Sequence, residues 1–184
     1  MARISDLVVE QLTPQQRRVH DAIASGPRGL VQGPLRVWLK SHELADKAQA
    51  LGAFCRYGTS LPQRLSELAI LVTGAYWKAG FEWHVHAPIG IAAGLDVGAV
   101  EAIRKGETPS FDKPDEMAVY AIAHELLHQR RVSTASYQTA VTLLGETAIV
   151  ELIGVLGYYG LISMTIVAFE VPLPDGAKAP FAGG

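Results

Sequence analysis

One short stretch of the sequence carries three side chains that can take up or release protons. Glu82, His84 and His86 lie close together, and Glu82 and His86 are four residues apart. On a helix this spacing places the carboxylate and the imidazole on the same face. A carboxylate next to an imidazole raises the pKa of the imidazole and fixes its tautomer. The pair therefore predicts general acid/base chemistry.

A further carboxylate, Glu67, lies in an otherwise apolar run, where a charged side chain needs a partner or a chemical role. Aromatic residues crowd the turn between Glu67 and Glu82, and such side chains form the walls of binding pockets. They are Tyr76, Trp77, Phe81 and Trp83. A plainer interpretation stays open, in which Glu82 caps a helix and both histidines are structural or exposed.

Residues 124–128 read His-Glu-Leu-Leu-His, the HExxH pattern of zinc proteases. On a helix the two imidazoles would bind zinc and the glutamate would act as general base. A zinc protease also needs a third ligand, and no histidine follows His128. The segment has an ordinary amphipathic interpretation too, with Met117 directed inward and Glu116 in solvent. We therefore predict no metal site.

The chain has a single cysteine, Cys55, so it has neither an intramolecular disulfide nor a CxxC redox pair. Peroxide reduction by thiols needs a thiolate nucleophile and a resolving thiol. A free thiol fits the reducing cytoplasm, where we expect the protein. The first residues lack a basic region followed by an apolar core, so no signal peptide is expected.

Glycine and proline divide the chain into helical segments, and no stretch shows the alternation of a strand. Capping residues mark helix starts at Thr13, Asp96 and Ser133, and Gly80 is expected to cap the end of the helix that carries Glu67. We predict an all-α fold of about seven or eight helices. The expected helices span about 14–25, 35–57 with a break near 41–42, 62–78, 81–93, 96–104, 114–129, 133–144 and 146–169.

Composition excludes several classes of protein. Apolar residues make up 49% of the 184 residues, so the chain is not disordered. Its 16 basic and 18 acidic side chains give a net charge of −2, which argues against a nucleic-acid binder. Charged residues make up only 18%, which is few for the surface of a monomer. A membrane helix, or an apolar surface buried between subunits, would explain this low share.

The apolar segment 148–169 is long enough to span a bilayer. However, it contains Glu151, has Tyr158 and Tyr159 at its middle, and lacks basic flanks. We therefore expect no membrane association, and a helix buried in the core or in a subunit interface.

Three motifs resemble the carboxymuconolactone decarboxylase family, which belongs to the alkylhydroperoxidase D-like superfamily. They are Arg64-x-x-Glu67-Leu-Ala-Ile-Leu, Phe81-Glu82-Trp83-x-x-His86 and Ala93-Gly94-Leu95, and the later segment 135–171, which contains Gly157-Tyr158-Tyr159, is similar too. Glu67 and His86 match a glutamate and a histidine of the superfamily. Ala79 and Glu82 stand where its two cysteines occur, so its peroxidase activity is not expected here.

The resemblance implies a homo-oligomer, a trimer or hexamer, with its site around the helical hairpin 62–93. It implies a carbon–carbon lyase that removes CO₂ from a small carboxylated lactone or related aromatic-degradation intermediate, with no metal or organic cofactor. His86 is then the proton donor, held in place by Glu82 or Glu67, and all three are expected catalytic residues. A cation is also expected for the substrate carboxylate. The expected substrate-binding residues are Arg64, Tyr76, Trp83 and His84.

Three parts of the chain follow from the same resemblance: an N-terminal helix and loop extension (1–34), the decarboxylase-like domain (35–174) and a flexible tail (175–184). In a straight antiparallel hairpin, Glu67 and His86 would lie about 10 Å apart along the axis, so a bent crossing or a bridging water has to join them. A peroxidase-type oxidoreductase and a non-catalytic oligomeric binding protein stay open as alternatives.

Overall fold

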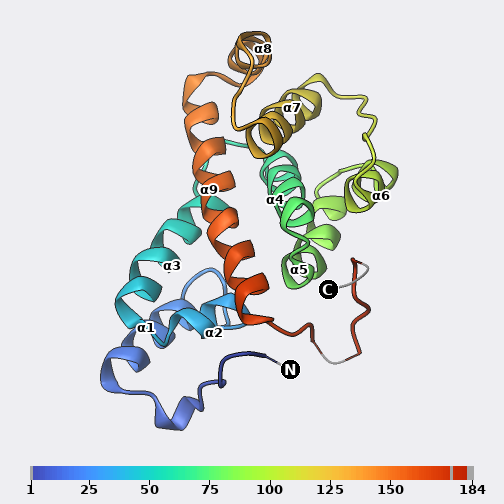
Figure 1. Ribbon diagram of the computed structural model, residues 1–184. Coiled ribbons are helices and arrows are strands. Elements are labelled where there is room, and N and C mark those ends of the chain that lie inside the picture. The colour runs from blue at the N-terminus through green and yellow to red at the C-terminus, as the bar shows by residue number, and fades with distance from the viewer. Residues whose placement is uncertain (1, 175, 182–184) are drawn as a thin grey trace.

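The computed structural model describes residues 2–174 and 176–181 of the chain, and within them all regular secondary structure is helical (Figure 1). This confirms the predicted all-α class, with nine α-helices in the described part rather than seven or eight. The expected break near residue 41 separates two of them. The elements are η1 (Val9–Gln11), α1 (Pro14–Ser25), α2 (Pro34–Trp38), α3 (His42–Tyr57), α4 (Gln63–Trp77), α5 (Gly80–Ala92), α6 (Val97–Lys105), α7 (Pro114–Gln129), α8 (Thr134–Leu144) and α9 (Glu146–Phe169).

Helix α4 is the centre of the fold. Every residue from Leu65 to Gly74 is buried, and the helix packs against α9, α5 and α7. Figure 1 shows α4 beside α9, with α7 near one of its ends and α5 near the other. Because neighbours surround it, α4 is apolar on nearly all sides, and Glu67 in its middle can remain charged only with a partner inside the protein.

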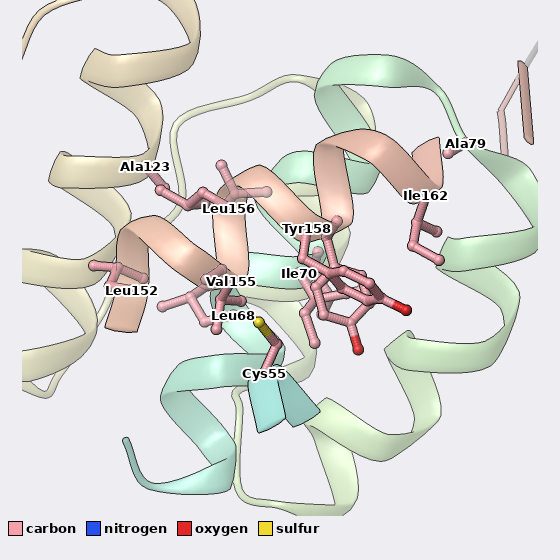
Figure 2. Close-up of a cluster of buried hydrophobic side chains, with 14 of the residues drawn as sticks. Cys55, Leu68, Ile70, Ala79, Ala123, Leu152, Val155, Leu156, Tyr158 and Ile162 are labelled. Atoms are coloured by element: carbon pink, nitrogen blue, oxygen red, sulfur yellow. The ribbon is translucent and has the colours of Figure 1, made fainter. Parts of the chain in front are cut away.

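Helix α9 supplies much of the remaining core. Leu152 and Val155 are fully buried, and Figure 2 shows both in one cluster with Leu68 of α4 and Cys55 of α3. By length and composition α9 could cross a membrane, but half of its most apolar window is buried in this fold, and one such helix is weak evidence for a membrane span. Its outer face exposes Val150 and Met164, and the expected subunit contact through this helix stays a prediction.

Both terminal segments pack against the domain. Val19 and Ile23 of α1 are buried in the same core as the rest of the fold, so the expected extension is part of it. The flexible tail stays a prediction, and within it Phe181 is buried, with its ring packed edge-on against Trp83 of α5. Residues 175 and 182–184 of the expected tail lie outside the described residues.

The helix caps follow the sequence closely, with one exception. Thr13 forms a capping box with Gln16, and Asp96 and Ser133 accept hydrogen bonds from the first turns of α6 and α8. The predicted cap at Gly80 is wrong. Lys78 ends α4 in the left-handed conformation (φ 51°), and the chain turns early enough for Gly80 to begin α5.

The crossing of α3 and α9 depends on Gly52. A Cβ atom at this position would lie 2.0 Å from the Tyr158 hydroxyl and 2.4 Å from an Arg28 guanidinium nitrogen. We expect Gly52→Ala to lower the free energy of unfolding by about 1–3 kcal/mol, because buried groups must move apart. Urea denaturation measures the change.

Gly154 of α9 provides the matched control, since a Cβ there meets nothing within 4 Å. In an open helical position Gly→Ala should stabilise by about 0.4–1 kcal/mol. Equal effects of the two substitutions would show that close packing at Gly52 does not matter.

Candidate active site

Glu67, Glu82 and His86 form one hydrogen-bonded chain inside the protein. The Nδ1 atom of His86 lies 2.7 Å from Oε2 of Glu67, and its Nε2 atom lies 2.8 Å from Oε1 of Glu82. The exposed fractions of the three residues are 2%, 4% and 3% in chain order. Both ring nitrogens of the imidazole are therefore engaged by carboxylates.

Close packing of α4 and α5 brings these side chains together. Two glycines face the two glutamates across the helix pair. A Cβ atom on Gly90 would lie 3.4 Å from Cβ of Glu67, and one on Gly74 would lie 3.9 Å from Cβ of Glu82. The direct distances show that no bridging water is needed to join Glu67 and His86 across the expected offset.

The two carboxylates control the charge of the imidazole. Burial alone lowers the pKa of His86, but the charge of Glu82 and the hydrogen bonds that the ring donates to Glu67 and Glu82 outweigh it and raise the pKa to about 9. At neutral pH the ring is therefore a buried imidazolium between two acidic groups, and it holds a proton that is available for transfer.

A cavity of about 50 Å³ lies beside this chain. His86 and Glu82 line it, whereas Glu67 lies behind them. Since a water molecule needs roughly 10–15 Å³ of such volume, the cavity holds a group of a few atoms. Of the two carboxylates, Glu82 is thus the one that can contact a ligand.

Other residues of the cavity lining come from segments that are distant in the sequence, and this part of the lining is varied in chemistry. It includes Arg28, from the loop before α2, Arg56 of α3, and the adjacent Tyr158 and Tyr159 of α9. The Tyr159 ring packs edge-on against His86, with 5.2 Å between ring centroids. Our sequence reasoning missed both arginines as site residues. The sequence feature that could have indicated this part of the cavity is the pair of tyrosines at the middle of an apolar helix.

The structure does not place Arg64 at this cavity. Its guanidinium binds Asp115 at 2.7 Å and also pairs with the buried Glu116. The cation expected for a substrate carboxylate is thus already neutralised by α7. The same pairing corrects the predicted orientation of α7, because Glu116 is buried and Met117 is 56% exposed.

The other three expected substrate-binding residues also lie outside the cavity lining. Trp83 is buried against Phe181, with 5.4 Å between ring centroids. His84 is exposed, because it lies on the opposite side of α5 from the buried His86. Tyr76 is 41% exposed and contacts His128 at the far end of α4.

The glutamate of the HExxH segment has a structural role. Glu125 accepts hydrogen bonds from the Ser133 amide and the Ser136 hydroxyl, both at 2.6 Å, and so joins α7 to the start of α8. His124 and His128 stack on each other with 4.3 Å between ring centroids. Within residues 2–174 and 176–181, no group of three or more acidic, histidine or cysteine side chains is placed to hold a metal ion.

The single thiol lies in the apolar core. Cys55 is 1% exposed, and burial raises its pKa despite the nearby charge of Arg28. A reactive thiol needs a lowered pKa and access to solvent. Cys55 has neither property.

No protein-family model and no curated protein matches the sequence. Three solved structures share the fold. A protein of unknown function from Agrobacterium tumefaciens, described as a putative antioxidant defence protein AhpD, is 16% identical with a TM-score of 0.66; the alignment covers 78% of this chain and 99% of that one. An uncharacterized peroxidase-related protein from Silicibacter sp. TM1040 is 12% identical with a TM-score of 0.75, over 95% of this chain and 92% of that one.

The third structure is the debrominase Bmp8, as a cysteine-to-alanine variant in complex with 2,3,4-tribromopyrrole. It is 15% identical with a TM-score of 0.75, over 98% of this chain and 96% of that one. At such identities the likeness shows the fold. The chain therefore has the helical fold of AhpD-like and peroxidase-related proteins, which agrees with the resemblance to the alkylhydroperoxidase D-like superfamily. Membership of the decarboxylase family stays a prediction.

Proposed function

We propose that this protein is a cofactor-independent enzyme that exchanges a proton with a small carboxylated substrate, in the manner of carboxymuconolactone decarboxylase. The observation that carries the proposal is the buried chain Glu67–His86–Glu82, which reaches the cavity at its Glu82 end. Buried acid/base groups with a strongly shifted pKa at a cavity are typical of catalytic sites.

The geometry assigns the residues different roles in this proposal. Both nitrogens of His86 are already bound, so the group that contacts the substrate is Glu82. His86 supplies the proton to Glu82, and Glu67 positions His86 through Nδ1. From the sequence we expected His86 itself to be the donor. Because its Nε2 atom is already bound to Glu82, we assign the contact with the substrate to Glu82 instead.

In the proposed reaction, the bond between a lactone carbon and its carboxylate carbon breaks and CO₂ leaves. The electron pair stays on the lactone and is delocalised into its conjugated carbonyl group. The same carbon or its conjugated position then takes a proton from Glu82, and one proton from solvent restores the site. Positioned acids of this kind contribute about 10²- to 10⁴-fold to a rate.

A thiol peroxidase is not our proposal, because the only cysteine is buried with a raised pKa. The debrominase of the same fold was crystallised with a small brominated pyrrole. Pyrrole carboxylates are therefore sensible members of a substrate panel beside lactone carboxylates.

The test uses Glu82→Gln, which keeps the size and a hydrogen-bonding oxygen but removes the acid. Each panel compound is incubated with the protein in D₂O, and CO₂ release and deuterium incorporation at carbon are followed. We expect Glu82→Gln to lower kcat by about 10²- to 10⁴-fold. Glu67→Gln should instead change the pH dependence of kcat, because it acts through His86. Glu43→Gln, at an exposed site in α3, is the control.

Full turnover by Glu82→Gln on a compound that the native protein decarboxylates would overturn the assigned roles. Absence of turnover on the whole panel, in protein that still binds the compounds, would favour the non-catalytic binding protein.

A further inference from the structure

The hydroxyl group of Tyr159 is a buried hydrogen-bond donor without a partner. The residue is 2% exposed and lines the cavity, yet its oxygen makes no hydrogen bond to any described residue. Buried polar groups in proteins are nearly always paired, and an exception needs an explanation. A group supplied by a ligand would provide one.

A second unpaired donor lines the same cavity. Within the described residues, three buried side-chain polar atoms have no partner: the Nε atom of Arg28, the Tyr159 hydroxyl and the Ser163 hydroxyl. Arg28 and Tyr159 are among the residues that line the cavity, and Ser163 is not. The Nη2 atom of Arg28 donates to the Tyr158 hydroxyl at 3.2 Å, which holds the guanidinium in place.

One acceptor group can satisfy both unpaired atoms, because the Tyr159 hydroxyl can donate and the Arg28 Nε atom can only donate. A guanidinium has donors and no acceptor. Burial raises the pKa of Tyr159 well above its ordinary value, so the hydroxyl keeps its proton at neutral pH. Arg56 adds a second positive charge to the cavity wall. The matching ligand group is an anion with at least two acceptor oxygens.

We propose that Tyr159 and Arg28 bind the carboxylate of the substrate, with Arg56 adding positive charge. The inference rests on the proposed function, whose cavity and carboxylated substrate it uses, and it names the residues that hold the carboxylate in the same lining as Glu82 and His86. A planar carboxylate fits a cavity of about 50 Å³ and offers one oxygen to each unpaired donor.

The charges on the site favour a monoanion. The cavity lining combines the two arginines with the Glu82 carboxylate, and His86 supplies one positive charge between Glu82 and Glu67. The Glu82 carboxylate in the same lining would repel a dianion such as phosphate more strongly than a monoanion. The segment 1–34, which we expected to be an extension of the domain, supplies Arg28 and so completes the site.

The test compares Tyr159→Phe with Ser163→Ala. Each substitution removes one buried, unpaired hydroxyl from α9, but only the first hydroxyl lies at the cavity. Isothermal titration calorimetry measures the binding of propionate, of the lactone carboxylate 5-oxotetrahydrofuran-2-carboxylate and of the neutral control propionamide. Urea denaturation of the free proteins shows whether each variant is folded.

We expect both carboxylates to bind and the amide to bind at least tenfold more weakly. Tyr159→Phe should weaken carboxylate binding by about 10- to 100-fold, the range for a hydrogen bond to a charged group. Ser163→Ala should change it less than twofold. Neither substitution should reduce stability, because neither hydroxyl is paired in the free protein. Arg28→Lys, which keeps the charge but loses the Nε donor, should also weaken binding.

Equal binding by the native protein and Tyr159→Phe would overturn the inference, as would equal binding of propionate and propionamide. Because binding is measured without turnover, the two proposals fail separately. Carboxylate binding that depends on Tyr159, with no turnover on any compound, would contradict the proposed reaction but support the carboxylate site. Turnover that depends on Glu82, with a KM unaffected by Tyr159→Phe, would support the reaction and contradict the carboxylate site.

Discussion

Replacing His86 with alanine should lower the free energy of unfolding by about 3–5 kcal/mol. The native imidazolium lies between the carboxylates of Glu67 and Glu82, and all three residues are almost completely buried. Without the ring, two acidic groups would face each other in the core with no compensating charge. Domains are stable by only about 5–15 kcal/mol, so this single change would leave the fold close to unfolding.

His84→Ala is the matched control, since His84 lies two residues away on the same helix and is exposed. Surface substitutions usually change stability by less than about 0.5 kcal/mol. Urea denaturation of both variants, together with circular dichroism, measures the difference. If the two variants were equally stable, the buried ion pairs would contribute nothing to the fold.

The same expectation decides how catalysis should be tested. A variant that loses activity because it unfolds says nothing about proton transfer. Glu82→Gln avoids this problem, because the amide keeps an oxygen for the Nε2 proton of His86 and places no new charge in the core. Loss of activity in that variant, with stability retained, reports on chemistry.

Local spacing explains which parts of the site were predictable. Glu82 and His86 are four residues apart on one helix, and the structure places them 2.8 Å from each other, as the periodicity of α5 requires. The capping residues Thr13, Asp96 and Ser133 bind the first turns of the helices that directly follow them, so the sequence predicted them equally well. Glu67 was predicted as a site residue from the family resemblance and from its unusual place in an apolar run.

Long-range pairing explains what was missed. Arg64 looked like a free cation in the sequence, but its partner Asp115 lies 51 residues away, and nothing in the local sequence indicates the pair. Conversely, Arg28 stands in a loop rich in glycine and proline, with no local mark of a site. It reaches the cavity only because α3, α5 and α9 converge there. Sequence patterns report which faces are apolar, and tertiary packing decides which charges remain unpaired.

The stability of the protein should fall as the pH rises from about 6.5 to about 9. The pKa of His86 is about 9 in the folded protein and 6.5 in an unpaired histidine, which represents the unfolded chain. Below pH 6.5 both states hold the proton, and the stabilisation from the two carboxylates is fully present. Between these values the folded state holds a proton that the unfolded state has lost, so raising the pH favours unfolding.

The free energy of unfolding should therefore decrease by on the order of 3 kcal/mol across this window, with a slope of about 1.4 kcal/mol per pH unit. Urea denaturation at pH 6, 7, 8 and 9.5 measures it. His84→Ala should keep the slope, because that histidine is exposed and outside the ion pairs. A stability that stays constant over this range would mean that His86 is neutral between its carboxylates, and the proton that our mechanism passes to Glu82 would be missing from the resting site.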